Sequence, residues 1–279
     1  MLKMAHDVYG KLSWEELFAP AIKIASEGWE ISERGEKLAN HVKHLAEFSG
    51  SSKMFLTRDG SAKPKGEILK NKQLAKTFKI ISKDVDEFYK GDIAKDIVDV
   101  VANTKVNPGL LTVKDLKTYK VAVGDLLCGP YKKYKICAMP MPSSGGLAIL
   151  QILGILEHFD LEQMEPFSAE AIHVISEAMR LVYADRAEFA ADDRFVEVPY
   201  ELLLDKEYLK LRSYKINIDA TMIDVEPGEF SVINKTPPFT FPKNKQIEPD
   251  STTHVSIIDS YGNAVSFTSS IEYSFGSGL

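Results

Sequence analysis

The chain has few cysteines, no long hydrophobic run and no surplus of positive charge. Cys128 and Cys137 are its only cysteines, and without a C-x-x-C pair they indicate neither a zinc site nor a disulfide framework, so we expect two buried free thiols. No apolar run approaches the roughly 18 residues that would span a bilayer. The formal net charge of -6, with Lys and Arg scattered among the acids, excludes the basic footprint of a nucleic-acid-binding protein.

Metal ligands and targeting signals are also scarce. His41 and His44 are three positions apart, but no carboxylate or further histidine completes a ligand set, so we assign no metal and no cofactor. His173 lies one position off an apolar helical stripe and is interpreted as a structural or surface residue. The N-terminal residues show no signal-peptide hydrophobic region. We expect the chain to begin partway through a larger gene product, which leaves its compartment unknown.

The sequence does contain enough apolar residues for a core. With 279 residues, 44% hydrophobic and 27% charged, it is typical of a globular protein with one large domain or two intertwined ones. Apolar residues at spacings of three and four predict helices over 14–27, 32–47, 67–81 and 91–104. Thr112 followed by Asp115 is close to a capping box that starts another helix. Residues 133–141 predict a short buried strand.

Prolines, serines and glycines separate this strand from a strongly apolar helix, in the segment MPMPSSGGLAILQILGILE. The prolines end the strand, and Ser143 or Ser144 can cap the helix. Gly145 and Gly146 allow a close backbone approach. A phosphate cradle at the helix N-terminus is the alternative, but the glycine spacings of known phosphate loops are absent.

The longest predicted helix covers residues 168–195. Its apolar stripe consists of Ile172, Ile175, Met179, Val182 and Phe189. The charged residues that lie off this stripe include Glu177 and Asp185. We expect most of them to form a solvated face.

The composition changes between residues 227 and 250, where repeated prolines exclude both a helix and a central strand. We expect an extended, exposed connection, and so long a structureless segment suggests a function. Residues 253–259 and 264–271 follow, with apolar and polar residues alternating on either side of a SYGN turn. This pattern predicts a β-hairpin.

Thr252, Thr253 and His254 stand at the mouth of this hairpin, directly after the connection. A threonine hydroxyl is a weak nucleophile unless a base lies beside it. Cleavage before Thr252 would supply that base, because the new α-amino group, with a pKa of about 8, would lie within reach of the hydroxyl of the same residue. From these residues alone, the alternative is that two β-favouring threonines simply begin a strand.

Seven segments, taken together, resemble the gamma-glutamyltranspeptidase family, in the order of that family and over residues 12–278. They are LSWEELFAPAIKIASEG, FYKGDIAKDIVDVV, GLLTVKDLKTY, MPSSGGLAILQILGILE, EAMRLVYADRAEF, STTHVSIID and YGNAVSFTSSIEYSFGSG. Each segment alone is weak evidence for the family. The resemblance depends on all seven segments occurring in the same order as in the family.

The resemblance implies an α+β fold, the four-layer αββα sandwich of N-terminal-nucleophile hydrolases, to which this chain contributes helical cover and a β-hairpin. It also implies a precursor that cleaves itself between Ser251 and Thr252. Residues 1–251 would then belong to the large subunit, and residues 252–279 would begin the small subunit of a heterodimer.

The resemblance further implies a reaction. Thr252 would attack gamma-glutamyl amides such as glutathione and transfer the glutamyl group to water, an amino acid or a peptide. Ser270 falls where the family has a threonine that positions the nucleophile. Glu272 falls on the contact to the glutamyl α-amino group, and a carboxylate suits an ammonium ion.

Parts of the family pattern are absent from the sequence. The residues after Thr252 stop before the serine pair and glycine pair that hold the oxyanion and the substrate carboxylate, and the N-terminal block with its carboxylate-binding arginine is missing. The SSGG at 143–146 matches a different block. Because losing one oxyanion donor costs on the order of a hundredfold in rate, we expect little activity from this chain alone. We also expect unpaired strand edges, which favour aggregation or dimerisation.

Two alternatives to a gamma-glutamyl-transferring enzyme remain. One is an acylase of the same fold, acting on a glutaryl or cephalosporin-type side chain; Glu272 argues against it, because a glutaryl group has no amine. The other is a non-catalytic scaffold, against which the intact Thr252, Thr253, His254 and Ser270 argue.

Overall fold

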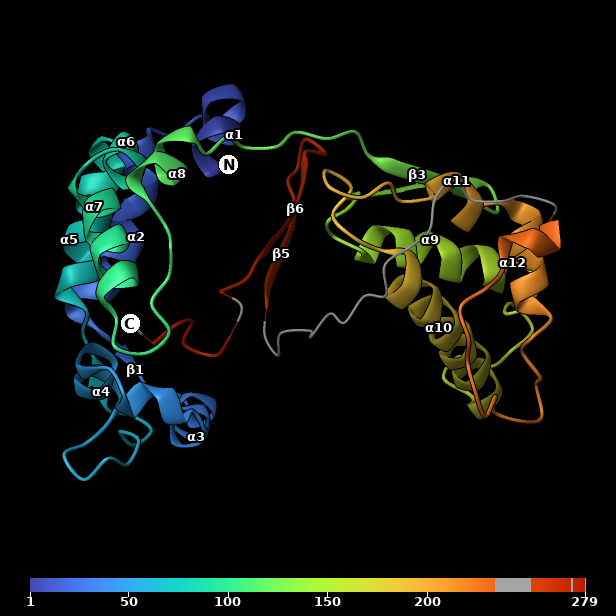
Figure 1. Cartoon of the computed structure of the whole chain (residues 1–279), viewed down its shortest axis with the longest axis horizontal. Coiled ribbons are helices and arrows are strands. Elements are labelled where there is room, and N and C mark those ends of the chain that lie inside the picture. The colour runs from blue at the N-terminus through green and yellow to red at the C-terminus, as the bar shows by residue number, and fades with distance from the viewer. Residues whose placement is uncertain (234–251, 272, 279) are drawn as a thin grey trace. The chain divides into compact units, whose positions relative to one another are not determined.

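A computed structural model describes residues 1–233, 252–271 and 273–278 of the chain. The chain divides into two compact units, one built from residues 1–121 and 248–279 and the other from residues 122–247 (Figure 1). Both are described separately below. Most of the secondary structure in the described residues is helical. The strands of these residues form three antiparallel sheets of two strands each, which agrees with the predicted α+β class. None of the helices in the described residues is long and apolar enough to cross a bilayer.

The first unit contains most of the helices. Its elements are α1 (Leu2–Tyr9), α2 (Trp14–Glu27), β1 (Trp29–Glu30), α3 (Glu33–His41), η1 (Lys43–Ala46), α4 (Ser49–Phe55), β2 (Ile68–Leu69), α5 (Lys72–Lys83), α6 (Asp86–Tyr89), α7 (Asp92–Asn103), α8 (Val113–Thr118), β5 (Thr253–Ile258) and β6 (Ala264–Ser269). Helices α2 and α5 pack together, and Phe18 of α2 contacts Phe78 of α5 with ring centroids 6.1 Å apart.

Local capping explains where the helices of this unit begin. Helix α2 has the predicted bounds and opens with a capping box formed by Ser13 and Glu16. The predicted capping box of Thr112 and Asp115 is confirmed at the start of α8. The helix predicted from residue 67 begins later, because Asn71 accepts a hydrogen bond from the Leu74 N–H at 2.8 Å and caps α5.

The residues after β6 are held against helices of the same unit. Phe275 packs beside a small buried cluster formed by Ala39, Leu45, Leu56 and Ala62. Its ring lies 4.7 Å, between centroids, from the ring of Phe55 in α4. The hydroxyl of Ser51 donates a hydrogen bond to the carbonyl of Gly278. The C-terminal segment is therefore anchored to α3, η1 and α4.

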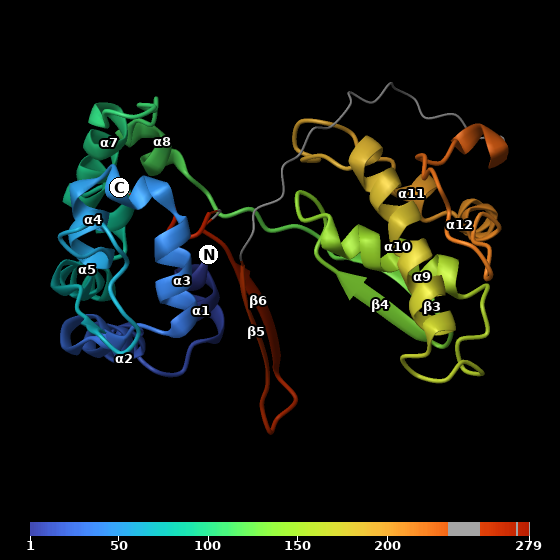
Figure 2. The same ribbon diagram turned by 90° about the horizontal axis from the view of Figure 1, so that it is seen from below.

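The second unit is built around one apolar helix. Its elements are β3 (Leu127–Tyr131), β4 (Tyr134–Ala138), α9 (Gly145–Leu156), α10 (Ala169–Phe189), α11 (Tyr200–Leu203), α12 (Lys206–Ser213) and η2 (Phe230–Ile233). Helix α9 contacts β3, β4, α10 and α12, and Figure 2 shows α10 crossing it. A Cβ on Gly146 would meet the carbonyl oxygen of Met139 at 2.2 Å, so the predicted close backbone approach is confirmed.

Helix α10 corrects the prediction of a solvated charged face. Ile172 and Met179 of the expected apolar stripe are exposed, whereas Glu177 and Asp185 are 2% and 0% exposed. Val182, in contrast, is buried as expected. The helix is turned toward α12 and the residues after it because buried partners there satisfy both carboxylates. Hydrophobic periodicity alone carries no information about such partners.

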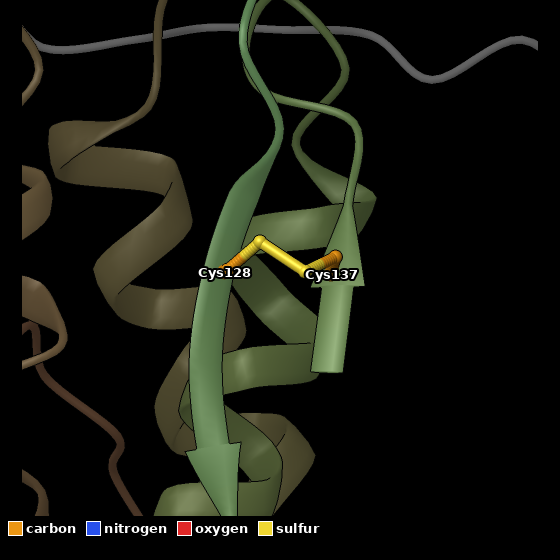
Figure 3. The surroundings of a disulfide bond; sticks show 2 residues. All are labelled: Cys128 and Cys137. Carbon is orange, nitrogen blue, oxygen red and sulfur yellow. A yellow bond between two sulfur atoms is a disulfide. The ribbon is translucent and has the colours of Figure 1, made fainter. Parts of the chain in front are cut away.

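The cysteines also differ from the prediction, which expected two buried free thiols. Cys128 of β3 and Cys137 of β4 occupy directly opposite positions in the hairpin and form a disulfide (Figure 3). Cys137 is exposed, and most of β4 is not buried, which contradicts the expected buried strand. The sequence spacing did not reveal this pairing because the turn that brings the two strands into register, residues 132 and 133, carries no glycine.

The β5–β6 hairpin confirms the prediction for residues 253–259 and 264–271. Register runs from Thr253 opposite Ser269 to Ile258 opposite Ala264. Asp259 begins the turn and accepts hydrogen bonds from the Asn263 N–H at 2.9 Å and its side-chain amide at 2.8 Å. Gly262 has φ +84, which glycine adopts without strain. Of the predicted proline-rich connection at 227–250, residues 234–250 lie outside the described residues.

Candidate active site

A groove of about 490 Å³ lies where the hairpin meets the N-terminal turn of α3. One wall comes from the hairpin and the segment after it. The other comes from the start of α3. The lining residues are Ser32, Arg34, Gly35, Leu38, Thr252, Thr253, Ser269, Ser270, Ile271, Tyr273, Ser274 and Phe275. The groove thus brings together Thr252 and Ser270, two of the residues predicted from the sequence.

The strand register explains why these two residues meet. Thr253 pairs with Ser269 at the end of the ladder, and Thr252 and Ser270 are the next residues beyond this pair, where a continued antiparallel register would bring them opposite each other. Opposite residues on one face of an antiparallel pair have Cβ atoms roughly 4.5 to 5.5 Å apart. Their hydroxyls can therefore approach one another, as the sequence argument requires of a nucleophile and its positioning residue.

One face of the hairpin is polar from Thr252 to Ser256 and becomes apolar only at the turn, where Ile258 pairs with Ala264. Because side chains alternate between faces, Thr252 shares its face with His254 and with the hydroxyl residues opposite. The imidazole of His254 makes hydrogen bonds through Nδ1 to Thr268 Oγ1 at 2.8 Å and through Nε2 to Ser256 Oγ at 2.9 Å. Ser266 Oγ lies 3.3 Å from the same Nε2. His254 therefore links β5 to β6 directly beside the predicted nucleophile.

The opposite face of the hairpin is apolar and largely exposed. Ile257 is 56% exposed and Val265, its cross-strand partner, is 57% exposed. Phe267 is partly buried and lines a separate apolar pocket with Trp14 and Phe18. The hairpin thus carries hydroxyl and imidazole side chains on one face and mainly apolar side chains on the other.

The wall formed by α3 is held in place by its N-cap. Ser32 accepts a hydrogen bond from the Gly35 N–H at 3.0 Å. The cluster around Leu45 packs beneath this helix through Ala39. Arg34 stands in the first turn with an exposed side chain. Sequence reasoning missed this wall, because no local pattern links residues 32–38 to residues so distant in the chain.

Two predicted site residues, Ser251 and Glu272, lie outside the described residues. Their neighbours Thr252, Ile271 and Tyr273 all line the groove. The roles assigned to Ser251, Thr252, Ser270 and Glu272 stay predictions. Within the described part of the chain, no group of His, Cys, Asp and Glu side chains is arranged to hold a metal ion.

Comparison with known proteins places the chain in a family. The signature of gamma-glutamyltranspeptidase matches residues 1–279. The chain belongs to the gamma-glutamyltranspeptidase family. The resemblance predicted from seven sequence segments is therefore confirmed.

Relatives of this gamma-glutamyltranspeptidase family member include enzymes made as precursors. The glutathione hydrolase proenzyme of Bacillus subtilis is 37% identical over 290 residues, a match that covers 100% of this chain and 47% of that protein. An acylase proenzyme from a Pseudomonas species is 29% identical and matches 96% of this chain and 45% of its own length. The chain thus spans about half the length of the curated relatives it matches.

A solved structure confirms the fold. The gamma-glutamyltranspeptidase of Helicobacter pylori is 33% identical and superposes with a TM-score of 0.73, covering 81% of this chain and 65% of the solved chain. The predicted N-terminal-nucleophile hydrolase fold class is correct.

Proposed function

We propose that the chain is part of a gamma-glutamyltransferase or glutathione hydrolase precursor that cleaves itself between Ser251 and Thr252. The observation that carries the proposal is the groove that Thr252 shares with Ser270, in a member of the gamma-glutamyltranspeptidase family. The name glutathione hydrolase proenzyme, borne by relatives at 34% and 37% identity, supports both the reaction and the processing.

Thr252 would do the chemistry in two stages. In the precursor its hydroxyl adds to the carbonyl carbon of Ser251, and the peptide nitrogen leaves as the α-amino group of Thr252, which leaves an ester between Ser251 and the Thr252 oxygen. Water then hydrolyses this ester, which releases the Ser251 carboxylate and frees the Thr252 hydroxyl. In the mature enzyme this amine takes the hydroxyl proton while the oxygen attacks the gamma-carbonyl of the substrate. The leaving amine receives the proton, and the glutamyl ester on Thr252 passes to water, an amino acid or a peptide.

The neighbouring residues would orient these steps. Ser270, opposite Thr252 in a continued register, would hydrogen-bond the nucleophile's oxygen and hold it toward the groove. Glu272 follows in the segment that lines the groove and would bind the ammonium of the gamma-glutamyl group. We propose no cofactor, because the hydroxyl and the α-amino group of Thr252 would supply the nucleophile and its base.

We also propose that the two cleavage products stay together as a heterodimer. Residues 1–121 and the segment that begins at Thr252 belong to one compact unit. Phe275 and Gly278 would hold the new small subunit against α4 after the bond is cut.

A substrate pair separates this function from that of an acylase. Glu272→Gln in a protein extended to the full length of its relatives should lower kcat/KM for glutathione by about tenfold to a hundredfold, because it removes a charge-assisted contact. Hydrolysis of the matched glutaryl amide, which lacks the α-amino group, should stay unchanged. Self-cleavage should also stay near normal. A wild-type preference for the glutaryl amide would favour the acylase. Equal kinetics of the wild type and Glu272→Gln on both substrates would show that Glu272 does not contact the substrate.

A further inference from the structure

The disulfide that joins β3 to β4 (Figure 3) lies on the face of the hairpin away from α9. On the other face, Leu127 packs against the core that α9 helps to form, and a Cβ on Gly129 would meet Leu150 of α9 at 3.2 Å. Because side chains alternate between the two faces of a strand, Cys128 and its cross-strand partner Cys137 point away from this core. Cys137 is exposed and Cys128 is half-buried, so the core does not shield the bond between the two sulfurs.

The hairpin has other attachments that persist if this bond opens. Its strands pair from Leu127 opposite Ala138 to Tyr131 opposite Tyr134, and α9 contacts both strands. The two cysteines are only 9 positions apart, and a crosslink that closes so short a loop restricts the unfolded chain less than one that closes a long loop. The disulfide can therefore open and close while the second unit stays folded.

One positive charge shares the face of the disulfide. Lys135 lies two positions before Cys137 on β4 and pairs with Pro130, so its side chain is on the same face. It is exposed, and the ion pairs found in the described part of the chain do not include it, whereas Lys132 pairs with Glu162. A nearby ammonium attracts anions and favours the thiolate form of cysteine. The site therefore suits an attacking thiol that is itself an anion.

We propose that Cys137 is a modification site for glutathione and related gamma-glutamyl thiols, the class of peptide that the proposed active site would hydrolyse. The thiolate of the peptide attacks Sγ of Cys137 and forms a mixed disulfide, while the bond to Cys128 breaks and its electron pair leaves on Cys128 as a thiolate. A second peptide thiolate attacks the peptide sulfur of the mixed disulfide, which releases the peptide disulfide and leaves Cys137 as a thiolate. Two thiol peptides are thus oxidised and one protein disulfide is reduced. The inference rests on the proposed function for the identity of the thiol.

Glutathione fits the charge of this face better than a neutral thiol does. As a thiolate it carries two carboxylates, one ammonium and the anionic sulfur, and the ammonium of Lys135 attracts this net negative charge. Exposure directs the attack to Cys137 rather than Cys128, because exchange needs an accessible sulfur. The mixed disulfide therefore forms on β4, and the released thiolate stays on β3.

Mass spectrometry of acid-quenched samples tests this site in the protein extended to the full length of its relatives. The oxidised protein is mixed with excess glutathione or with 2-mercaptoethanol, a neutral thiol, and free thiols are alkylated with a maleimide after the quench. Glutathione should appear on Cys137 and the maleimide on Cys128. Lys135→Gln should slow opening by glutathione about twofold to fivefold, the worth of one exposed charge contact, and should change opening by 2-mercaptoethanol less. Lys206→Gln, at an exposed lysine of α12, is the matched control.

Three results would overturn the proposal: glutathione found on Cys128 instead of Cys137, opening only in denaturant, or equal rates of opening by glutathione in the wild type and Lys135→Gln. An equal slowing in Lys206→Gln would overturn it as well. Release of glutamate from glutathione, measured separately, tests the proposed function, because the exchange requires neither cleavage nor turnover. Exchange without hydrolysis would count against the proposed function alone, and hydrolysis without exchange would count against this site alone.

Discussion

At the scale of single residues, the buried carboxylate of Asp185 shows how polar contacts shape the second unit. It accepts hydrogen bonds from Tyr208 at 2.9 Å, from Gln151 at 3.2 Å and from the Gly228 N–H at 2.8 Å, and it pairs with Arg212 at 2.9 Å. Burial raises the pKa of Asp185, and the charge of Arg212 opposes that rise. The contact with Gly228 ties the segment after α12 to α10.

We predict that Asp185→Asn destabilises the second unit by about 3 kcal/mol or more, because it leaves the buried Arg212 without a countercharge. Replacing both partners, as Asp185→Leu with Arg212→Met, should cost less than the single change, since no charge is then buried. Denaturant unfolding of the three proteins provides the comparison. Asp224→Asn, at an exposed position, serves as the control. A double variant less stable than Asp185→Asn would contradict this view of the pair.

His254 leads to a second residue-scale prediction. Its imidazole links Thr268 to Ser256 beside Thr252, so His254→Ala should loosen the polar face and slow self-cleavage by about twofold to tenfold, the worth of one neutral hydrogen bond. His254→Gln can bridge the same groups in part and should recover part of the rate. Time courses by mass spectrometry measure the effect. His173→Gln, on α10 in the other unit, should cleave at the wild-type rate; an unchanged rate for His254→Ala would exclude the positioning role.

At the scale of elements, sequence patterns were reliable where the causes are local. The bounds of α2, the capping box of α8 and the alternation in the β5–β6 hairpin could all be predicted from the sequence, because each depends on residues a few positions apart. The orientation of α10 and the α3 wall of the groove could not be predicted from the sequence. Both depend on partners distant in the chain, such as Arg212 for Asp185.

The hairpin also leads to a prediction about self-association. Among the described residues β5 pairs only with β6, and a two-stranded hairpin with an exposed apolar face is marginally stable by itself. The chain should therefore self-associate at high concentration through this face. Ile257→Lys should shift the sedimentation equilibrium toward monomer, whereas Ser260→Lys, in the turn, should not. Identical association in all three proteins would show that the hairpin is not the contact.

At the scale of the whole molecule, the proposed cleavage site does not lie at a boundary between the two compact units. The residues that follow Thr252 belong to the same unit as residues 1–121, so cutting the chain before Thr252 leaves this unit assembled from two polypeptides. The proline-rich connection at 227–250 would then become the free end of the large-subunit part. Cleavage would then form the new amine of Thr252 while the hairpin stays in the same unit as α3, the other wall of the groove.

Intact mass measurement of the purified protein tests the central claim, that Thr252 is the nucleophile exposed by self-cleavage. Under denaturing conditions the wild type should give two polypeptides whose masses sum to the chain plus one water, separated between Ser251 and Thr252. Thr252→Ala should give one uncut chain, and Thr253→Ala, one position along, should still be cut. A wild type that stays uncut while it hydrolyses glutathione, or a Thr252→Ala protein cleaved at the same bond, would contradict the account.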